Sequence, residues 1–306
     1  MAACGGRTSL PTSGEPFGGD DAAALSNAFK VTYAVHSYGF TTWHSNGAET
    51  VDKTSLVAGI SCTYDGRFTA FGRFAMPPTF EVRDSTGAVV RVQEGDIEAL
   101  RPDGARAIVG RPTDDHDYCM GTLDADDTFV EIGCFDRNNV TTSLVAAAYA
   151  PNGTSVLWER VVYDPVTTST LVAFEIGRED STDRHEVAPL TPVGHFYSSP
   201  AFSFDGTRIV YVDTEKNYDV AYSDVDVVDL ATFTTTKVLA NVPWVLDAAF
   251  TPDGTSLVIL QSSTEDMGSE SDAIRRIDLS THEESTLFEE TQGQLIRSAF
   301  CLARDD

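Results

Sequence analysis

Short runs of alternating apolar and polar residues fill most of the chain, and many of them are followed by a turn signal. The stretch "FSFDGTRIVY" at 202–211 shows the unit: one strand, an Asp-Gly pair and a second alternating strand. Period-two alternation is typical of β-strands. Tight hairpin turns need positive φ, which Gly, Asp and Asn tolerate. Helical patterns are nearly absent outside 21–29, so the chain is predicted to be all-β.

The strand–turn–strand unit recurs five times, with spacings of 38, 49, 53 and 48 residues between turns. Periods of this length are typical of propellers and solenoids. After each turn come a second strand, a variable loop and two further strands; the third strands at 225–232 and 274–281 end alike in Asp-Leu-small-Thr. Four antiparallel strands per repeat describe a propeller blade. The turn pairs are Asp65-Gly66, Asp103-Gly104, Asn152-Gly153, Asp205-Gly206 and Asp253-Gly254.

The two ends of the chain predict how the ring closes. Residues 294–306 supply an innermost strand with no hairpin after it, and 29–53 supply three strands that lack an innermost partner. We therefore predict a six-bladed β-propeller of four-stranded antiparallel blades, closed by a blade shared between the N- and C-termini. Seven blades are the alternative. Residues 28–306 would form this single domain, and 1–27 a flexible tether rich in Gly, Ser, Pro and Thr.

The repeat resembles a known family. "PAFSFDGTRIVY" (200–211) and "TPDGTSLVI" (251–259) are similar to the TolB-like, or WD40-like PD40, β-propeller repeat, and the resemblance covers about residues 55–290. Tyr64 and Phe204 stand where the family motif has proline, and Asn152 replaces its aspartate. The resemblance implies a propeller and, as a class of function, protein interaction in the bacterial envelope. It does not identify the partner.

The N-terminal residues predict a lipid anchor. Cys4 follows two alanines, as at the end of a bacterial lipobox, although no hydrophobic signal region precedes it. Because Gly5 is not aspartate, the family analogy favours the outer membrane over inner-membrane retention. We expect an exported lipoprotein that faces the periplasm or the cell surface.

The other four cysteines are an even number, as expected of an exported protein. Cys119 and Cys134 lie symmetrically about residues 126–127, so a hairpin turning there would place them opposite each other and within disulfide reach. Cys62 and Cys301 fall on predicted innermost strands, one in the first clear repeat and one in the closing strand. A disulfide there would staple the ring; buried free thiols are the alternative.

The formal net charge of -26, from 30 Asp and 17 Glu against 17 Arg and 4 Lys, restricts the partners. Such a chain repels nucleic acid and anionic lipid, so we expect no nucleic-acid partner and membrane contact only through the anchor. A solvated acidic surface, a saline habitat and a cationic partner or divalent ions all fit this balance. We expect a monomer.

The sequence contains no nucleophile elbow and no zinc-protease motif, and we predict no catalytic residue. Weak candidates for a metal site are Asp96, Glu98, His195 and Asp247, which fall near the starts of innermost strands and would face one mouth of the channel. Six-bladed lactonases hold calcium there with carboxylates and amides.

Three functions follow from these observations. The first is a non-enzymatic, envelope-anchored scaffold that docks a protein, peptide or other ligand and needs no cofactor. The second is a calcium-dependent hydrolase of the lactonase or gluconolactonase type. The third is a glycan-binding module, which needs exposed aromatic rings on one face.

Overall fold

The computed structural model describes residues 28–305 apart from short gaps at 36–38, 53–56, 74, 113–116, 137–141, 165, 167–168, 182, 218–219, 263–271 and 290–295. Within this part of the chain all regular structure is β-strand, which confirms the all-β prediction. The described residues include no helix long and apolar enough to pass through a membrane. Cys4 lies outside the described residues, so its lipidation stays a prediction.

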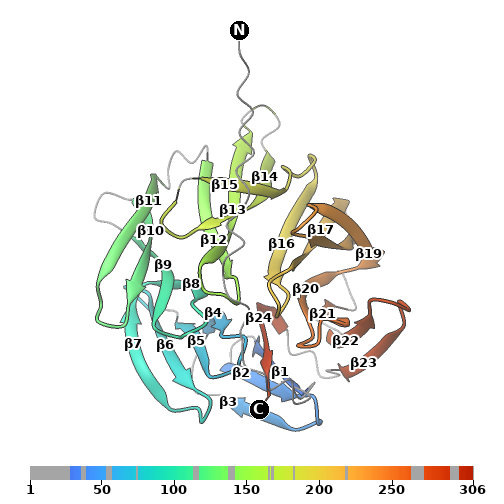
Figure 1. The fold of residues 1–306 in the computed structure, drawn as a ribbon, viewed down its shortest axis with the longest axis horizontal. Helices are drawn as coiled ribbons and strands as arrows, with labels where there is room; N and C mark the ends of the chain where they lie inside the picture. The colour runs from blue at the N-terminus through green and yellow to red at the C-terminus, as the bar shows by residue number, and fades with distance from the viewer. Residues whose placement is uncertain are drawn as a thin grey trace.

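The strands pair into six four-stranded antiparallel sheets set around a common centre, which is the arrangement of a β-propeller (Figure 1). Blade 1 contains β4 (Val57–Cys62), β5 (Phe68–Arg73), β6 (Thr79–Asp84) and β7 (Val89–Glu94). Blade 2 contains β8 (Asp96–Leu100), β9 (Arg106–Pro112), β10 (Asp117–Asp124) and β11 (Phe129–Asp136). Blade 3 contains β12 (Thr142–Tyr149), β13 (Ser155–Asp164), β14 (Ser169–Arg178) and β15 (Arg184–Ala188).

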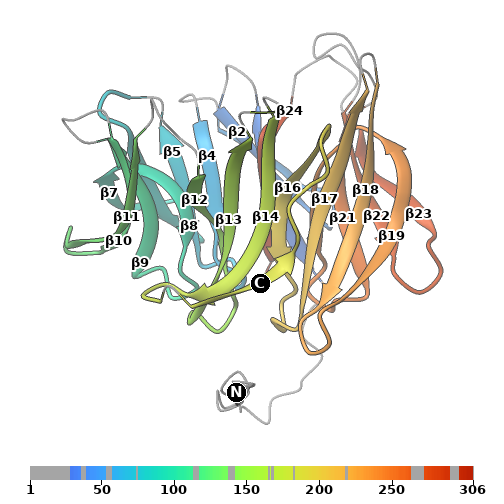
Figure 2. The same ribbon diagram turned by 90° about the horizontal axis from the view of Figure 1, so that it is seen from above.

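Blade 4 contains β16 (His195–Phe202), β17 (Arg208–Asn217), β18 (Val220–Asp229) and β19 (Thr234–Pro243). Blade 5 contains β20 (Val245–Phe250), β21 (Ser256–Ser262), β22 (Asp272–Asp278) and β23 (Glu284–Glu289). The closing blade contains β24 (Ile296–Arg304), β1 (Phe29–Val35), β2 (Gly39–His44) and β3 (Glu49–Asp52), in that order. Seen from the side, the strands run between two faces that carry the turns and loops (Figure 2).

The closing blade joins the two ends of the chain, as the sequence predicts. β24 lies at the centre and pairs antiparallel with β1, with Thr32 opposite Cys301. The predicted disulfide between Cys62 and Cys301 is present and links β4 to β24, with the two Cα atoms 6.0 Å apart. Lys30 Nζ donates to the carbonyl of Gly66 at 3.1 Å, so the first repeat turn is also tied to the closing blade.

The five repeat turns share one geometry, which differs from the expected one in a single respect. Only the glycine of each pair takes positive φ, for example +71° at Gly66, whereas Asp65 does not. The Asp65 carboxylate instead accepts the N–H of Arg67 at 3.1 Å and the hydroxyl of Thr63 at 2.7 Å. The aspartate is therefore selected as an acceptor that holds the turn. The other four repeats place the same backbone hydrogen bond on Asp103, Asn152, Asp205 and Asp253.

The Cys119–Cys134 disulfide is also confirmed, through a bulge that the sequence did not reveal. The hairpin turns at Asp124–Thr128 and is centred on Asp126, half a residue before the midpoint of this pair. A register shift between Met120 and Gly121 then adds one residue on β11 and restores the alignment. The two cysteines lie directly opposite, with Cα atoms 4.0 Å apart.

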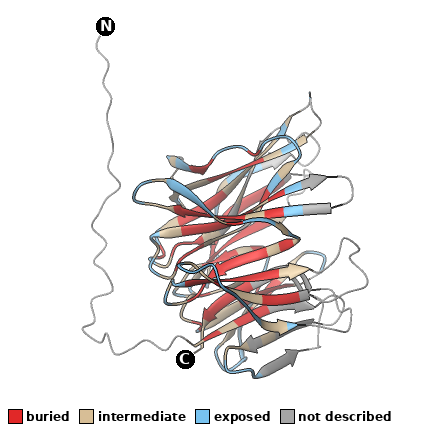
Figure 3. Cartoon of the chain, turned by 90° about the vertical axis from the view of Figure 1, so that its right-hand side faces the viewer, coloured by how far each residue is buried: buried red, intermediate tan, exposed pale blue. Residues whose placement is uncertain are grey.

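The core lies between neighbouring blades, because each sheet buries its faces against the next one. Figure 3 shows the buried residues along the strands and the exposed ones toward the loops. Trp158 of β13 is fully buried in a cluster that joins blades 2 and 3. Phe174, Tyr197 and Tyr211 pack together between blades 3 and 4, with ring centroids 4.9–5.6 Å apart. The five complete repeats thus stabilise one another pairwise.

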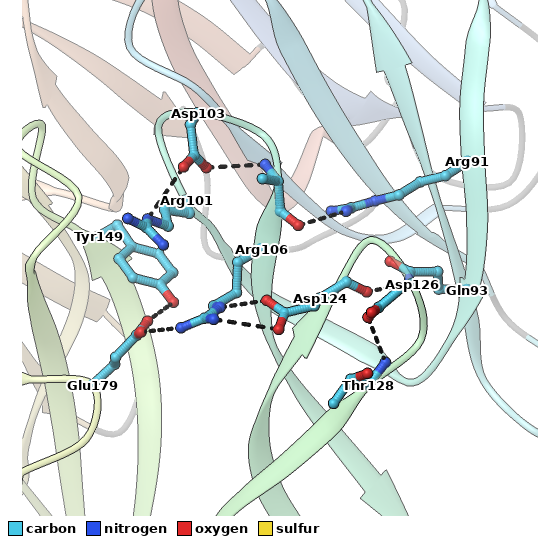
Figure 4. Close-up of polar contacts among 11 residues, drawn as sticks. Arg91, Gln93, Arg101, Asp103, Arg106, Asp124, Asp126, Thr128, Tyr149 and Glu179 are labelled. Atoms are coloured by element: carbon cyan, nitrogen blue, oxygen red, sulfur yellow. Dashed lines mark hydrogen bonds and ion pairs between the residues drawn. The ribbon is translucent and has the colours of Figure 1, made fainter.

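Charged groups add to the junction between blades 2 and 3 (Figure 4). Arg106 of β9 donates to Asp124 of β10 at 2.5 Å and to Glu179, which follows β14, at 2.5 Å. The hydroxyl of Tyr149 on β12 donates to the second oxygen of Glu179 at 2.5 Å. Gln93 of blade 1 reaches the carbonyl of Asp124 at 2.7 Å, so the network touches three blades.

Candidate functional site

Bulges in the innermost strands decide which side chains enter the centre of the ring. The innermost strands of blades 1 to 5 each lose register once against their second strand. In β8 the shift falls between Ile97 and Ala99, so Glu98 has no residue opposite it. A bulge bends the strand and re-aims the extra side chain. Glu98 is in this way turned into the channel, where it lines a cavity.

The cavity lies where the innermost strands meet, has a volume of about 350 Å³, and takes lining residues from all six sheets. Most of its lining residues are apolar, but polar and apolar atoms contribute about equally to the exposed wall. The ionisable carboxyl groups in the wall are those of Glu98, Glu159 and Asp247. No described lining residue is a lysine, arginine or histidine. The cavity therefore holds acidic groups without a basic neighbour in its own wall.

An aromatic pair crosses the channel at the end where the repeat turns lie. Tyr64 comes from the turn of blade 1 and Phe204 from the turn of blade 4, and their rings meet edge to face with centroids 5.3 Å apart. Tyr64 also donates its hydroxyl to the carbonyl of Tyr149 in blade 3 at 2.9 Å. These two residues are the ones that depart from the proline of the repeat motif. These two substitutions of the motif proline therefore place an aromatic contact across one end of the channel.

Burial changes the acidity of two of the channel carboxyls. Glu98 and Glu159 are half-buried, and no described residue forms a hydrogen bond or ion pair with either of them. Burial, together with the nearby charges of Asp96 and Glu159, raises the pKa of Glu98 to about 8. Burial raises the pKa of Glu159 to about 6. Near pH 7 the cavity therefore holds Glu98 mostly protonated and Glu159 mostly ionised.

The structure separates the four sequence candidates. Glu98 and Asp247 line the cavity; Asp247 is buried and accepts the N–H of Ala248 at 2.8 Å. Asp96 and His195 are not among the lining residues. Asp96 instead accepts the hydroxyl of Tyr118 at 2.8 Å, and His195 Nδ1 lies 3.0 Å from Asp213.

Sequence reasoning missed Glu159 because it lies on β13, a second strand, whereas the channel was expected to be lined by innermost strands alone. One signal was available. Glu159 interrupts the run "SVLWERVVY", in which Val156, Leu157 and Trp158 are fully buried. An acid directly after such a run indicates a functional role.

A preformed calcium set is not found in the channel. Within the described part of the chain, the one group of three His, Cys, Asp or Glu ligand atoms within 4.8 Å of one another is Cys119, Glu131 and Cys134. Both cysteines of that group are disulfide-bonded. The carboxylates of Glu98, Glu159 and Asp247 do not converge closely enough for the coordination that calcium prefers.

The aromatic residues bear on the glycan alternative. Trp158 is 0% exposed and lies under the guanidinium of Arg184, 4.8 Å from its ring centre, so it serves packing. The exposed aromatic rings among the described residues include Tyr163, Phe196 and Tyr222, at the loop ends of β13, β16 and β18. A glycan platform would have to be built from these rings.

Comparison with known proteins supports the fold. No protein-family model and no curated protein matches the sequence. Among solved structures, TolB from Acinetobacter baumannii is similar with a TM-score of 0.66 and 14% identity, over 92% of this chain and 67% of that one. A candidate TolB from Agrobacterium tumefaciens gives 0.57 and 11%, over 89% and 92%. A candidate 6-phosphogluconolactonase from Bacteroides fragilis gives 0.53 and 12%, over 92% and 99%. The chain is a TolB-like β-propeller in fold.

Proposed function

We propose that this protein is a non-enzymatic propeller of the bacterial envelope that docks a protein or peptide partner at its central channel. The observation that carries the proposal is the cavity, whose carboxyls Glu98 and Glu159 have no hydrogen-bonding or ionic partner among the described residues. Acids with raised pKa values that face a cavity without a partner in its wall are candidates for ligand binding. The fold likeness to TolB supports protein interaction as the class of function.

The same proposal places the chain outside the cytoplasm. Two disulfides are consistent with folding in an oxidising compartment. We further propose that Cys4 carries a lipid that anchors the protein at the outer membrane, and that the propeller is a monomer. Mass spectrometry of the protein from envelope fractions should find diacylglycerol on Cys4, and Cys4→Ser should release the protein from the membrane. An unmodified thiol in the native protein would contradict the anchor.

Site-specific photocrosslinking in the source cells tests the docking site. A photoreactive benzoylphenylalanine would replace Ile60 or Val145, which line the cavity, or the exposed Thr235 on β19 as the control. We expect a discrete protein adduct from the two channel positions and none from Thr235. Adducts from Thr235 at equal yield, or none from either channel position, would contradict docking at the channel.

A second candidate function is favoured by one observation. A carboxyl with a pKa near 8 in a cavity has the acidity of a general acid or base at neutral pH, so Glu98 would suit a hydrolase. The fold likeness to a candidate lactonase keeps this alternative open without deciding it. If the protein hydrolyses lactones and Glu98→Gln abolishes this activity, the hydrolase function is supported and the scaffold function is contradicted.

A further inference from the structure

The proposed docking function leaves open which chemical group enters the channel. We propose that it is an organic ammonium, the side chain of a partner lysine or a free alkylamine of the same chemistry, held between the carboxylates of Glu98 and Glu159. This inference rests on the proposed function for the identity of the partner, but not for the chemistry of the site.

The charges in the wall set the sign of the ligand. Glu98 projects from the bulge of β8 and Glu159 from β13, on neighbouring blades 2 and 3. Asp247 adds a third carboxyl from blade 5, and Asp96 lies nearby on β8. The two tyrosines at the cavity, Tyr64 and Tyr149, already direct their hydroxyls to Tyr149 O and Glu179. Near pH 7 the ionised carboxylate of Glu159 has no counter-charge in the wall, and a cation is the ligand that supplies one.

The geometry favours an organic cation over a metal ion. The carboxylate oxygens do not gather within the distance that a shared divalent ion needs. An ammonium group carries three donors in different directions, so it can bond to two carboxyls at once without the third ligand that a divalent ion would need. Its alkyl stem would contact the apolar wall, which includes Ile60, Leu100 and Val145.

Binding of such a cation must be linked to protons. In the empty cavity Glu98 is mostly protonated at neutral pH, because burial and the charges of Asp96 and Glu159 raise its pKa to about 8. A bound ammonium favours the ionised carboxyl, so Glu98 releases its proton when the ligand enters. Affinity should therefore rise by up to about tenfold per pH unit between pH 6 and pH 7.5 and level off above the pKa. Glu159, whose pKa burial raises to about 6, completes its titration early in that range.

Calorimetric titration of the full chain tests this inference. The probes are n-hexylammonium and the peptide acetyl-Gly-Lys-Gly-amide, with hexanol, the norleucine peptide and CaCl₂ as comparisons. We expect saturable binding of both ammonium probes at pH 8, weakening at pH 6, with heats that depend on the ionisation enthalpy of the buffer. The two neutral probes should bind at least tenfold more weakly. Equal binding of neutral and cationic probes, or binding of calcium alone, would overturn the proposal.

Two neutral variants assign the binding to the cavity. Glu98→Gln and Glu159→Gln keep the shape of each side chain, and each should weaken ammonium binding at least tenfold at pH 8. Glu98→Gln should also abolish the proton release. The matched controls are Glu94→Gln and Glu289→Gln, which remove one charge from exposed positions on outer strands and should bind like the wild type. Equal losses in all four variants would show diffuse surface electrostatics and contradict the proposal.

The outcomes separate this inference from the proposed function. If the photocrosslinked partner forms its adduct equally with Glu98→Gln, Glu159→Gln and the wild type, docking stands and the ammonium inference fails. If n-hexylammonium binds as described and no channel adduct forms, the cation site stands and the docking function fails.

Discussion

Two blade junctions of this ring are held together by different means. Between blade 1 and the closing blade, the Cys62–Cys301 disulfide joins the two innermost strands, and the N–H of Arg304 donates to the carbonyl of Tyr64 at 3.0 Å. Between blades 2 and 3, the joining groups are polar: Arg106 bridges Asp124 and Glu179 (Figure 4). One junction is covalent and the other is polar.

The difference follows from the path of the chain. Blades 2 and 3 are consecutive, and each is built from one continuous stretch of chain. The closing blade also leads directly into blade 1 through β3 and β4, but its innermost strand β24 comes from the other end of the chain. The closing junction joins residues separated by 239 positions, and that closure costs conformational entropy. A propeller has to restrain its ends, and here the restraint combines strand pairing with a disulfide.

The polar junction is partly screened by solvent, which limits its strength. The side chain of Arg106 is 30% exposed and that of Glu179 18% exposed. Hydrogen bonds to Asp124 and Glu179 raise the pKa of Arg106, so the guanidinium keeps its charge at every accessible pH. We expect this junction to contribute modest stability, insensitive to mild alkali.

The largest expected loss of stability comes from removing the disulfide that closes the ring. Replacing both Cys62 and Cys301 by alanine should lower the free energy of unfolding by about 5 kcal/mol in the chain-entropy account of disulfides. Tm should fall by about 10 °C in scanning calorimetry. Cys119→Ala with Cys134→Ala, which removes a 15-residue link, is the control and should cost about 3 kcal/mol. If both double variants lose the same free energy of unfolding, the long-range disulfide contributes no more stability than the local one, and this prediction is wrong.

A matched glycine pair tests the same junction without touching the disulfide. Gly66 and Gly153 have nearly the same φ, +71° and +68°. A Cβ at Gly66 would collide with the carbonyl oxygen of Arg304 in the closing strand, whereas one at Gly153 meets nothing closer than 3.4 Å. Gly66→Ala should therefore destabilise by about 2 kcal/mol more than Gly153→Ala, measured by urea unfolding. If the two variants are equally stable, the contact between the Gly66 turn and the closing strand does not stabilise the ring.

Removing a polar contact between blades 2 and 3 should lower the free energy of unfolding less than removing the disulfide does. Glu179→Gln removes the charge that Arg106 and Tyr149 share, and should cost about 1–2 kcal/mol. Glu186→Gln, at an exposed position that contacts Arg160 at 3.3 Å, is the control and should cost at most about 0.5 kcal/mol. A loss from Glu179→Gln as large as that from the disulfide variant would remove the distinction between the two junctions.

The last expected effect is a gain of stability, and it concerns the channel. Glu98 has a folded pKa above its unfolded value, so the native state holds a proton that the unfolded state has lost between about pH 4.5 and pH 8. By linkage, stability falls as pH rises through that window. Glu98→Gln does not ionise, so its advantage in stability over the wild type should grow by about 1 kcal/mol per pH unit between pH 4.5 and pH 8, as measured by urea unfolding at pH 4.5 and pH 8.5. A loss of stability at pH 8.5 would contradict the burial of the carboxyl.

The ring and its closure could be predicted because their signals are local or symmetric. Asp-Gly pairs mark hairpins wherever they occur, and the spacing of Cys119 and Cys134 fits any hairpin centred between them. The channel chemistry was less accessible. Glu98 enters the cavity through a bulge, which has no signature in a strand of five residues, and Glu159 enters from a second strand. Contacts such as that of Arg106 with Glu179 join residues 73 positions apart and depend on how blades pack.

The measurement that tests the account most directly is a carboxyl ¹³C titration of Glu98 by NMR, with and without saturating n-hexylammonium, assigned by comparison with Glu98→Gln. The account predicts a pKa of about 8 in the free protein and a fall of at least one unit when the cation is bound. A pKa near 4.3 in the free protein, or one that does not move with the cation, would contradict the account of the channel.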